Sequence, residues 1–233
     1  MKRHVLLSIT VILISVASAF AQSGKTGPLT WKLKKGTLTI SGTGAMPDYE
    51  EFDAPWHIYK ESINSVTIET GVTTIGDKSF YACSKLTSIT IPSSVTTIGN
   101  DAFKLCNRLT LITIPSNVTT IGSYAFMRCD SLASITVPSS VTTIESSVFS
   151  SCSSLTSITI PSSVTTIRNF AFERCRNLTS ITNLNPVPFE ISPYVFSGVN
   201  QSTCTLKVPK NAVSAYKNTE VWKEFTIVGI ENN

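Results

Sequence analysis

The sequence predicts an α/β repeat solenoid, in which a parallel β-sheet covers one side of a stack of turns and turns or short helical segments cover the other. A 23-residue unit recurs almost five times, and such a period is the mark of a solenoid. Apolar and polar residues alternate within each unit as in a half-buried strand. The segments at both ends depart from the unit, as capping units do. Copies begin at Ile63, Leu86, Leu109, Leu132 and Leu155, with a less regular sixth copy from Leu178.

Residues 1–21 have the features of a secretory signal peptide. Lys2 and Arg3 precede an apolar run over residues 5–20, and residues 19–21 form an A-x-A cleavage signal. The alternative, an uncleaved membrane anchor, fits less well because the run is shorter than the roughly 20 apolar residues of a spanning helix. We therefore expect cleavage after Ala21, no membrane insertion afterwards, and a mature protein that is secreted or held at the cell surface.

The two ends of the mature chain are expected to cap the array. In the N-terminal cap, residues 22–62, two alternating segments flank Lys35 and Gly36 and predict a β-hairpin, and an aromatic loop follows. In the C-terminal cap, residues 202–233, we expect a short helix with Asn211 as its N-cap. Trp222 and Phe225 would close the core at that end.

The repeats themselves occupy residues 63–201, and the first half of each unit predicts one short parallel strand. In the second copy Ile89 and Ile91 alternate with Ser88 and Thr90, which places one face of the strand in the core. Pro92 then ends the strand, because proline has no N–H to donate to a ladder.

The second half of each unit is expected to return the chain across the back through a tight turn and a short helical or 3₁₀ segment. Glu145 and Arg168 stand where three other copies have glycine, so this position does not demand a positive φ. One phenylalanine per copy predicts a buried aromatic spine. The spine comprises Phe80, Phe103, Phe126, Phe149, Phe172 and Phe196.

The outward positions of the predicted strands form a surface that we call the hydroxyl ladder. One interpretation is a ligand-binding surface; the other is that threonine simply suits an exposed strand, because it is β-branched and polar. Leu111 is an apolar exception at a position where the other copies have serine. The ladder comprises Ser65, Thr67, Ser88, Thr90, Leu111, Thr113, Ser134, Thr136, Ser157, Thr159, Ser180 and Thr182.

Cysteine recurs with the same period, which raises the question of disulfides in an exported protein. Cysteines on neighbouring turns would point their Cβ atoms side by side, and five of them cannot all pair. We therefore expect a column of buried free thiols. The column comprises Cys83, Cys106, Cys129, Cys152 and Cys175, and Cys204 lies apart from it.

The residues offer little support for catalysis, a metal or a cofactor. His57 is the only histidine after residue 21, and no nucleophile motif accompanies it. No Cys/His spacing resembles a zinc site. Four carboxylates in the N-terminal cap are expected to be a solvated acidic loop, with calcium binding as the alternative. They are Asp48, Glu50, Glu51 and Asp53.

The charge of the chain is nearly balanced, which argues against a nucleic-acid partner. Without Lys2 and Arg3, the 19 basic residues become 17, against 15 acidic ones. Several basic residues fall close to the cysteine-bearing turn, and stacking would gather them along one edge; scattered solvated charge is the alternative. They are Lys85, Lys104, Arg108, Arg128, Arg174 and Arg176.

The unit L-x-x-I-x-I-P-x-x-V-x-x-I-G-x-x-A-F-x-x-C resembles the leucine-rich repeats of the BspA type. Residues 36–47 resemble the segment that precedes these repeats in secreted proteins of Bacteroides-like bacteria, and residues 204–222 resemble their C-terminal close. The resemblance implies a curved, right-handed leucine-rich-repeat solenoid with its parallel sheet on the concave face. It also implies a surface or secreted protein of the kind implicated in adhesion to host matrix proteins and to other bacteria.

We therefore expect a non-enzymatic, cofactor-free, monomeric binding protein. Its partner would be a protein or glycan on host matrix or bacterial surfaces, held by the hydroxyl ladder, since solenoids offer extended concave surfaces. The alternatives are a purely structural surface module, an ice-binding protein with regular Ser/Thr ranks, or an enzyme built around His57 or a pair of carboxylates.

Overall fold

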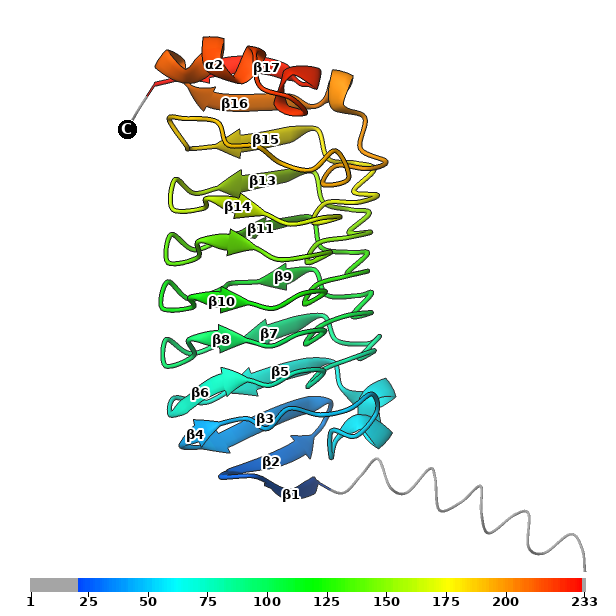
Figure 1. Ribbon diagram of the computed structural model, residues 1–233. Coiled ribbons are helices and arrows are strands. Elements are labelled where there is room, and N and C mark those ends of the chain that lie inside the picture. The colour runs from blue at the N-terminus through cyan, green and yellow to red at the C-terminus, as the bar shows by residue number, and fades with distance from the viewer. Residues whose placement is uncertain (1–20, 232–233) are drawn as a thin grey trace, which may run out of the picture.

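A computed structural model describes residues 21–231, which form a single β-solenoid (Figure 1). The chain winds around one axis and places a row of strands on each of two sides. The repeat solenoid predicted from the 23-residue period is confirmed. The predicted signal peptide, apart from Ala21, lies outside the described residues.

The first half of each unit forms the front sheet, as predicted. Neighbouring strands are parallel and in register, so that Ser65 pairs with Ser88 and Ser157 pairs with Ser180. The β-branched residues of these segments suit a half-buried pleat. The front-sheet strands are β3 (Thr37–Gly42), β5 (Ser65–Ile68), β7 (Ser88–Thr90), β9 (Leu111–Ile112), β11 (Ser134–Thr136), β13 (Ser157–Ile160), β15 (Ser180–Asn183), β16 (Thr205–Pro209) and β17 (Thr226–Ile230).

The second half of each unit forms a back sheet instead of a helical segment, so the helical alternative predicted for the repeats is wrong. The Val-Thr-Thr-Ile segments pair with one another within the first three copies and again within the fourth and fifth, because β-branched residues favour the extended backbone. The predicted tight turns follow each of these segments. The back-sheet strands are β4 (Gly44–Ala45), β6 (Val72–Ile75), β8 (Thr97–Ile98), β10 (Thr120–Ile121), β12 (Thr143–Ile144) and β14 (Thr166–Ile167).

Helical structure within residues 21–231 is confined to the two caps. The one α-helix, α2 (Val213–Lys217), begins after Ala212 with no side-chain cap, so the predicted capping role of Asn211 is wrong. The 3₁₀ segments are η1 (His57–Ser62), η2 (Gln201–Thr203), η3 (Lys210–Ala212) and η4 (Trp222–Glu224).

The N-terminal cap contains the hairpin that the sequence predicts. Strand β2 (Leu29–Lys34) pairs antiparallel with β3, which in turn pairs parallel with the first repeat strand. An additional strand that the sequence did not predict, β1 (Gln22–Thr26), covers the free edge of β2.

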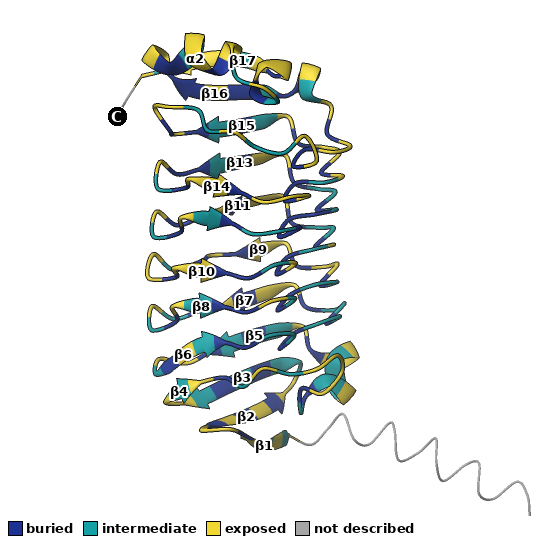
Figure 2. Cartoon of the chain, in the orientation of Figure 1, coloured by how far each residue is buried: buried dark blue, intermediate teal, exposed yellow. Residues whose placement is uncertain are grey.

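The phenylalanine spine is a stack of nearly parallel rings inside the solenoid. Neighbouring ring centroids lie 5.4 Å apart from Phe80 to Phe103 and 5.3 Å apart from Phe172 to Phe196. Trp56 continues the stack into the N-terminal cap at 5.8 Å, and Trp222 closes it edge-on at 5.8 Å. Each unit therefore shares its core with both neighbours, as Figure 2 shows by the buried residues that recur in every turn.

The recurring glycine is required by close approach of the backbone. None of Gly76, Gly99 and Gly122 has a positive φ, which agrees with the sequence interpretation. A Cβ atom on Gly122 would meet the backbone nitrogen of Asn100 at 2.6 Å. The position therefore selects glycine because the preceding turn leaves no space for a side chain.

Both sheets are interrupted between the third and fourth copies. Strand β9 does not pair with β11, and β10 does not pair with β12. The tight turns remain joined, since the amide of Phe126 donates to the carbonyl of Val148 at 2.9 Å. At this junction, among the described residues, backbone hydrogen bonds join the two copies at the phenylalanine-bearing turns but no strand pairing joins them in either sheet. We call it the open junction.

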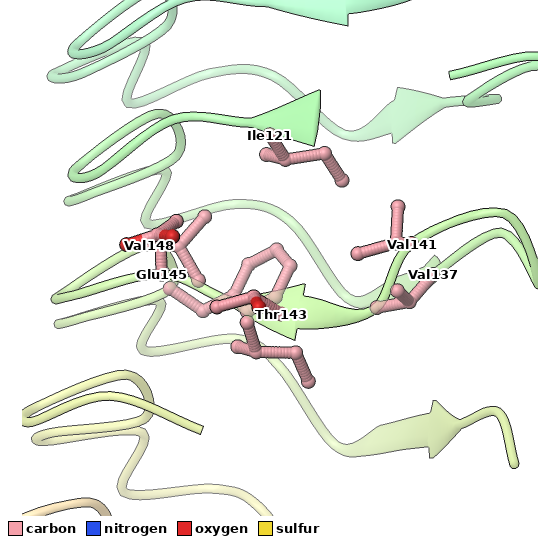
Figure 3. Close-up of a pocket in the computed structure, with 8 residues that line it drawn as sticks. Ile121, Val137, Val141, Thr143, Glu145 and Val148 are labelled. Atoms are coloured by element: carbon pink, nitrogen blue, oxygen red, sulfur yellow. The ribbon is translucent and has the colours of Figure 1, made fainter. Parts of the chain in front are cut away.

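Two enlarged residues distinguish the open junction. Glu145 replaces the recurring glycine, and Val148 replaces an alanine found in three other copies. Arg168 also replaces the glycine, yet its amide still donates to the carbonyl of Ile144 at 2.9 Å. In that copy the alanine position is again occupied by alanine, Ala171. A small apolar cavity lies in the gap, and Figure 3 shows Ile121 on one turn above side chains of the next.

Candidate functional site

The hydroxyl ladder lies on the outer surface of the front sheet, as predicted. All of its members are exposed or half-buried, whereas the residues between them are buried. Serines stack on serines and threonines on threonines, as Ser134 with Ser157 and Thr136 with Thr159 show. The structure therefore brings residues separated by 23 positions into two straight columns.

Most ladder hydroxyls have no hydrogen-bond partner within the described chain. The exception is Ser65, whose Oγ lies 3.0 Å from Oγ1 of Thr37. A neighbouring threonine column is engaged instead: Oγ1 of Thr87 donates to the carbonyl of Asn64 at 2.9 Å, and Thr110 repeats this contact. The ladder hydroxyls are thus left to solvent or to a ligand, while the adjacent column serves the fold.

The ladder extends onto both caps, which the sequence reasoning missed. Thr37 and Thr39 pair with Ser65 and Thr67 at one end. At the other end Thr182 pairs with Lys207. The alternation in residues 37–40 matches that of the repeats and was the available signal.

Leu111 is the exposed apolar centre of this surface, with 65% of its side chain accessible. It pairs with Ser88 on one side. On the other side it borders the open junction, where β9 has no paired neighbour. The one apolar position of the ladder therefore coincides with the place where the sheet is interrupted.

A second column of free hydroxyls lies on the back sheet and was not predicted. Its residues are half-buried or exposed and follow the same register, as the pairing of Thr97 with Thr120 shows. The back sheet offers one such column and the front sheet two. The back-sheet column comprises Thr74, Thr97, Thr120, Thr143 and Thr166.

The repeat signature matches one family of known proteins. The model of the BspA type leucine rich repeat region matches six copies over residues 57–179 and 144–228. The chain belongs to the BspA-type leucine-rich repeat family. No curated protein matches it.

Solved structures of other leucine-rich repeat proteins resemble this BspA-type solenoid. A leucine-rich repeat protein from Eubacterium ventriosum is 25% identical with a TM-score of 0.64, and the match covers 89% of this chain but only 62% of that one. The leucine rich repeat protein of T. pallidum is 30% identical with a TM-score of 0.53, covering 69% and 71%. A protein from Faecalibacterium prausnitzii, described as a leucine rich cell surface protein, is 25% identical with a TM-score of 0.51, covering 82% and 72%.

Two of these relatives are named as leucine-rich repeat proteins and the third as a leucine rich cell surface protein, and none of the three carries an enzymatic name. Within residues 21–231 of the BspA-type chain, no helix combines the length and the apolar character needed to cross a bilayer.

All six cysteines of the BspA-type chain are buried and unpaired, as the sequence predicted for the five of the column. The thiols of the column also make a regular contact: Sγ of Cys106 donates to the carbonyl of Phe80 at 3.2 Å, and Sγ of Cys152 donates to that of Phe126 at 3.2 Å. Cysteine therefore serves as a small apolar residue with one weak donor.

Burial raises the pKa of the Cys83 and Cys175 thiols from about 9 to about 12. We expect all six thiols of the native protein to resist iodoacetamide at pH 8 and to react fully in denaturant, because the thiolate is the nucleophile.

Since the folded protein retains these protons at higher pH than the unfolded chain, its free energy of unfolding should fall as pH rises from about 9 to about 12. Mass spectrometry after alkylation and denaturation curves across this pH range would check both results; rapid alkylation of the native protein would contradict them.

His57 and two acidic residues of the N-terminal cap contact neighbouring residues of the cap and of the first repeat. Burial, with a smaller effect of Lys60, lowers the pKa of His57, whose ring lies 4.9 Å from that of Phe52. Oδ1 of Asp48 accepts a hydrogen bond from the amide of Asp77, and Glu50 pairs with Lys78 at 2.9 Å. No group of three potential metal ligands occurs within residues 21–231.

Proposed function

We propose that this BspA-type protein is an exported, non-enzymatic binding protein that adheres to a protein or glycan on host matrix or bacterial surfaces. The binding surface is the hydroxyl ladder of the front sheet. The observation that carries the proposal is that eleven of its twelve positions are Ser or Thr, and apart from Ser65 their hydroxyls have no partner within the described chain.

The geometry of the front sheet favours a broad contact. Its strands are held in register by the backbone within two blocks, β3 to β9 and β11 to β17, and the shared core joins the blocks, so the hydroxyls are positioned before a partner arrives. Such preorganisation lowers the ordering cost of binding. Hydroxyl groups both donate and accept, which suits sugar hydroxyls and the peptide groups of a protein alike.

Leu111 adds an apolar anchor inside this polar surface. Interfaces commonly place apolar residues at their centre and polar residues at the rim. The exposed Leu111 side chain lies beside Ser88 across the pair of β7 and β9, which reproduces that arrangement on a small scale.

The test is a triple variant, Thr90→Lys, Thr113→Lys and Thr136→Lys, which places bulky charges along one ladder column. We expect adhesion to matrix-coated surfaces or to bacterial cells to fall at least about tenfold, equivalent to about 1.4 kcal/mol. Surface plasmon resonance on immobilised matrix proteins and whole-cell adhesion would measure it.

The matched control places the same three lysines on the back sheet, at Thr97, Thr120 and Thr166. This control should retain binding, and both variants should keep the melting temperature of the parent protein. Equal binding by the front-sheet variant and the parent would locate the contact elsewhere.

A further inference from the structure

Basic side chains gather at the edge where the cysteine-bearing turns stack. The backbone at this edge is regular: the amide of Arg128 donates to Ser150 at 2.9 Å, and that of Ser151 donates to Glu173. Lys104 is engaged there, since it pairs with Asp101 at 2.7 Å and lies 5.2 Å from the ring centroid of Tyr124. The arginines farther along the edge are therefore the available cations.

Three of these arginines surround a hollow that spans the third, fourth and fifth copies. The hollow has a volume of about 350 Å³ and includes Arg128, Arg174 and Arg176 in its lining. The fourth copy supplies Ser151 and Ser153, short side chains at positions where the fifth copy has arginine. The hollow exists because small residues lie between large ones.

The two outer arginines occupy equivalent positions two turns apart. Arg128, Ser151 and Arg174 share the same left-handed backbone, with φ values of 59°, 61° and 56°. With neighbouring turns about 4.8 Å apart, the two arginine backbones lie roughly 10 Å from each other. A tetrahedral oxyanion placed over Ser151 would lie within reach of both guanidinium groups.

The hollow carries excess positive charge. Arg128 and Arg176 pair with no carboxylate among residues 21–231, and Nε of Arg174 lies 3.6 Å from Glu173, beyond hydrogen-bonding distance. The one acid in the lining is Asp130, whose carboxyl pKa is raised because the effect of burial exceeds the opposing effect of Arg128. Three guanidinium groups thus stand against two carboxyl groups, that of Asp130 in the lining and that of Glu173 beside Arg174.

We propose that this arginine hollow binds sulfate groups of a linear anionic polysaccharide that runs along the cysteine edge. Guanidinium forks bind oxyanions through paired hydrogen bonds, and the Ser151 and Ser153 hydroxyls supply further donors. Arg108 and Lys85 lie near the same turn in the second and first copies, one residue past the repeat position of Arg176. Cations distributed along one edge of a rigid solenoid fit an extended polyanion better than a rounded protein surface.

The inference goes beyond the proposed function, because the cysteine edge and the front sheet are separate surfaces of the solenoid. The experiment measures binding of the mature chain to three probes by calorimetry. They are a heparin decasaccharide, a heparosan decasaccharide that carries carboxylates but no sulfates, and inorganic sulfate. We expect heparin to bind, with an affinity that falls as salt rises, and the other two to bind at least about tenfold more weakly, equivalent to about 1.4 kcal/mol.

A triple variant tests the residues: Arg128→Gln, Arg174→Gln and Arg176→Gln should lose at least about tenfold in heparin affinity. The control Lys25→Gln, Lys35→Gln and Lys217→Gln removes the same charge from exposed positions of the two caps and should retain the affinity. Equal losses in both variants, equal affinity for heparosan, or no heparin binding by the parent would each overturn the proposal. The variant with lysine at Thr90, Thr113 and Thr136 is tested by adhesion and not by heparin binding. Failure of the proposed function and failure of this inference can therefore be told apart.

Discussion

Replacement of Phe126 by Ala is expected to lower the free energy of unfolding by roughly 3 to 5 kcal/mol. Phe126 is fully buried in the middle of the spine, and its ring lies 5.4 Å from that of Phe103 and 5.8 Å from that of Phe149. The substitution leaves a cavity and removes both stacking contacts, and the stiff, hydrogen-bonded turns on either side cannot collapse fully into the gap. Urea denaturation followed by circular dichroism would measure the change.

The matched control is Phe170→Ala, because Phe170 lies on the surface of the same edge with 37% of its side chain accessible. It contacts Tyr194 at 5.5 Å and is outside the spine. We expect its loss to cost less than about 1 kcal/mol. Equal costs for the two substitutions would show that the spine is not the principal source of stability.

Replacement of Gly122 by Ala is expected to destabilise the protein by about 1 to 3 kcal/mol. The sign is diagnostic, because Gly→Ala at an unstrained position with negative φ stabilises by about 0.4 to 1 kcal/mol through the unfolded state. Here the new Cβ would meet the backbone nitrogen of Asn100 at 2.6 Å and the carbonyl carbon of Gly99 at 2.7 Å. Backbone atoms cannot rotate away, so the turns must separate. Denaturation curves and amide hydrogen exchange at Gly122 would report the effect.

The reverse change tests the same explanation at the open junction. The double variant Glu145→Gly and Val148→Ala restores the residues that the second and third copies carry. We expect slower hydrogen exchange at the amides of Ala133 and Thr142, because each would gain a partner in the third copy. A stabilised Gly122→Ala variant, or unchanged exchange in the double variant, would contradict the close-approach explanation.

Much of the architecture follows from the sequence because each unit repeats the same physical constraints. The alternation of Ile89 and Ile91 with polar residues indicates one buried strand face, and the regular phenylalanine and cysteine indicate a shared core. The back sheet was harder to foresee. A Val-Thr-Thr-Ile segment is too short for its period to separate a strand from a turn, and its pairing depends on the neighbouring copy.

The candidate binding surfaces could also be predicted only in part from the sequence. The ladder positions could be predicted individually, since alternation fixes which side chains point outward. Their extension onto Thr37 and Lys207 could not be predicted from the repeat pattern, because it depends on how the caps pair with the array. The arginine hollow required the stacking of three turns, since Arg128 and Arg174 are 46 positions apart in the sequence.

The sequence by itself determined the solenoid, its period, the front strands, the aromatic spine and the column of buried thiols, because these depend on patterns within one unit that every neighbour repeats. Only the tertiary structure decided the second sheet, the free or engaged state of each hydroxyl, and the open junction at Glu145 and Val148. Those features depend on distances between turns, where one extra side chain determines whether two backbones can meet.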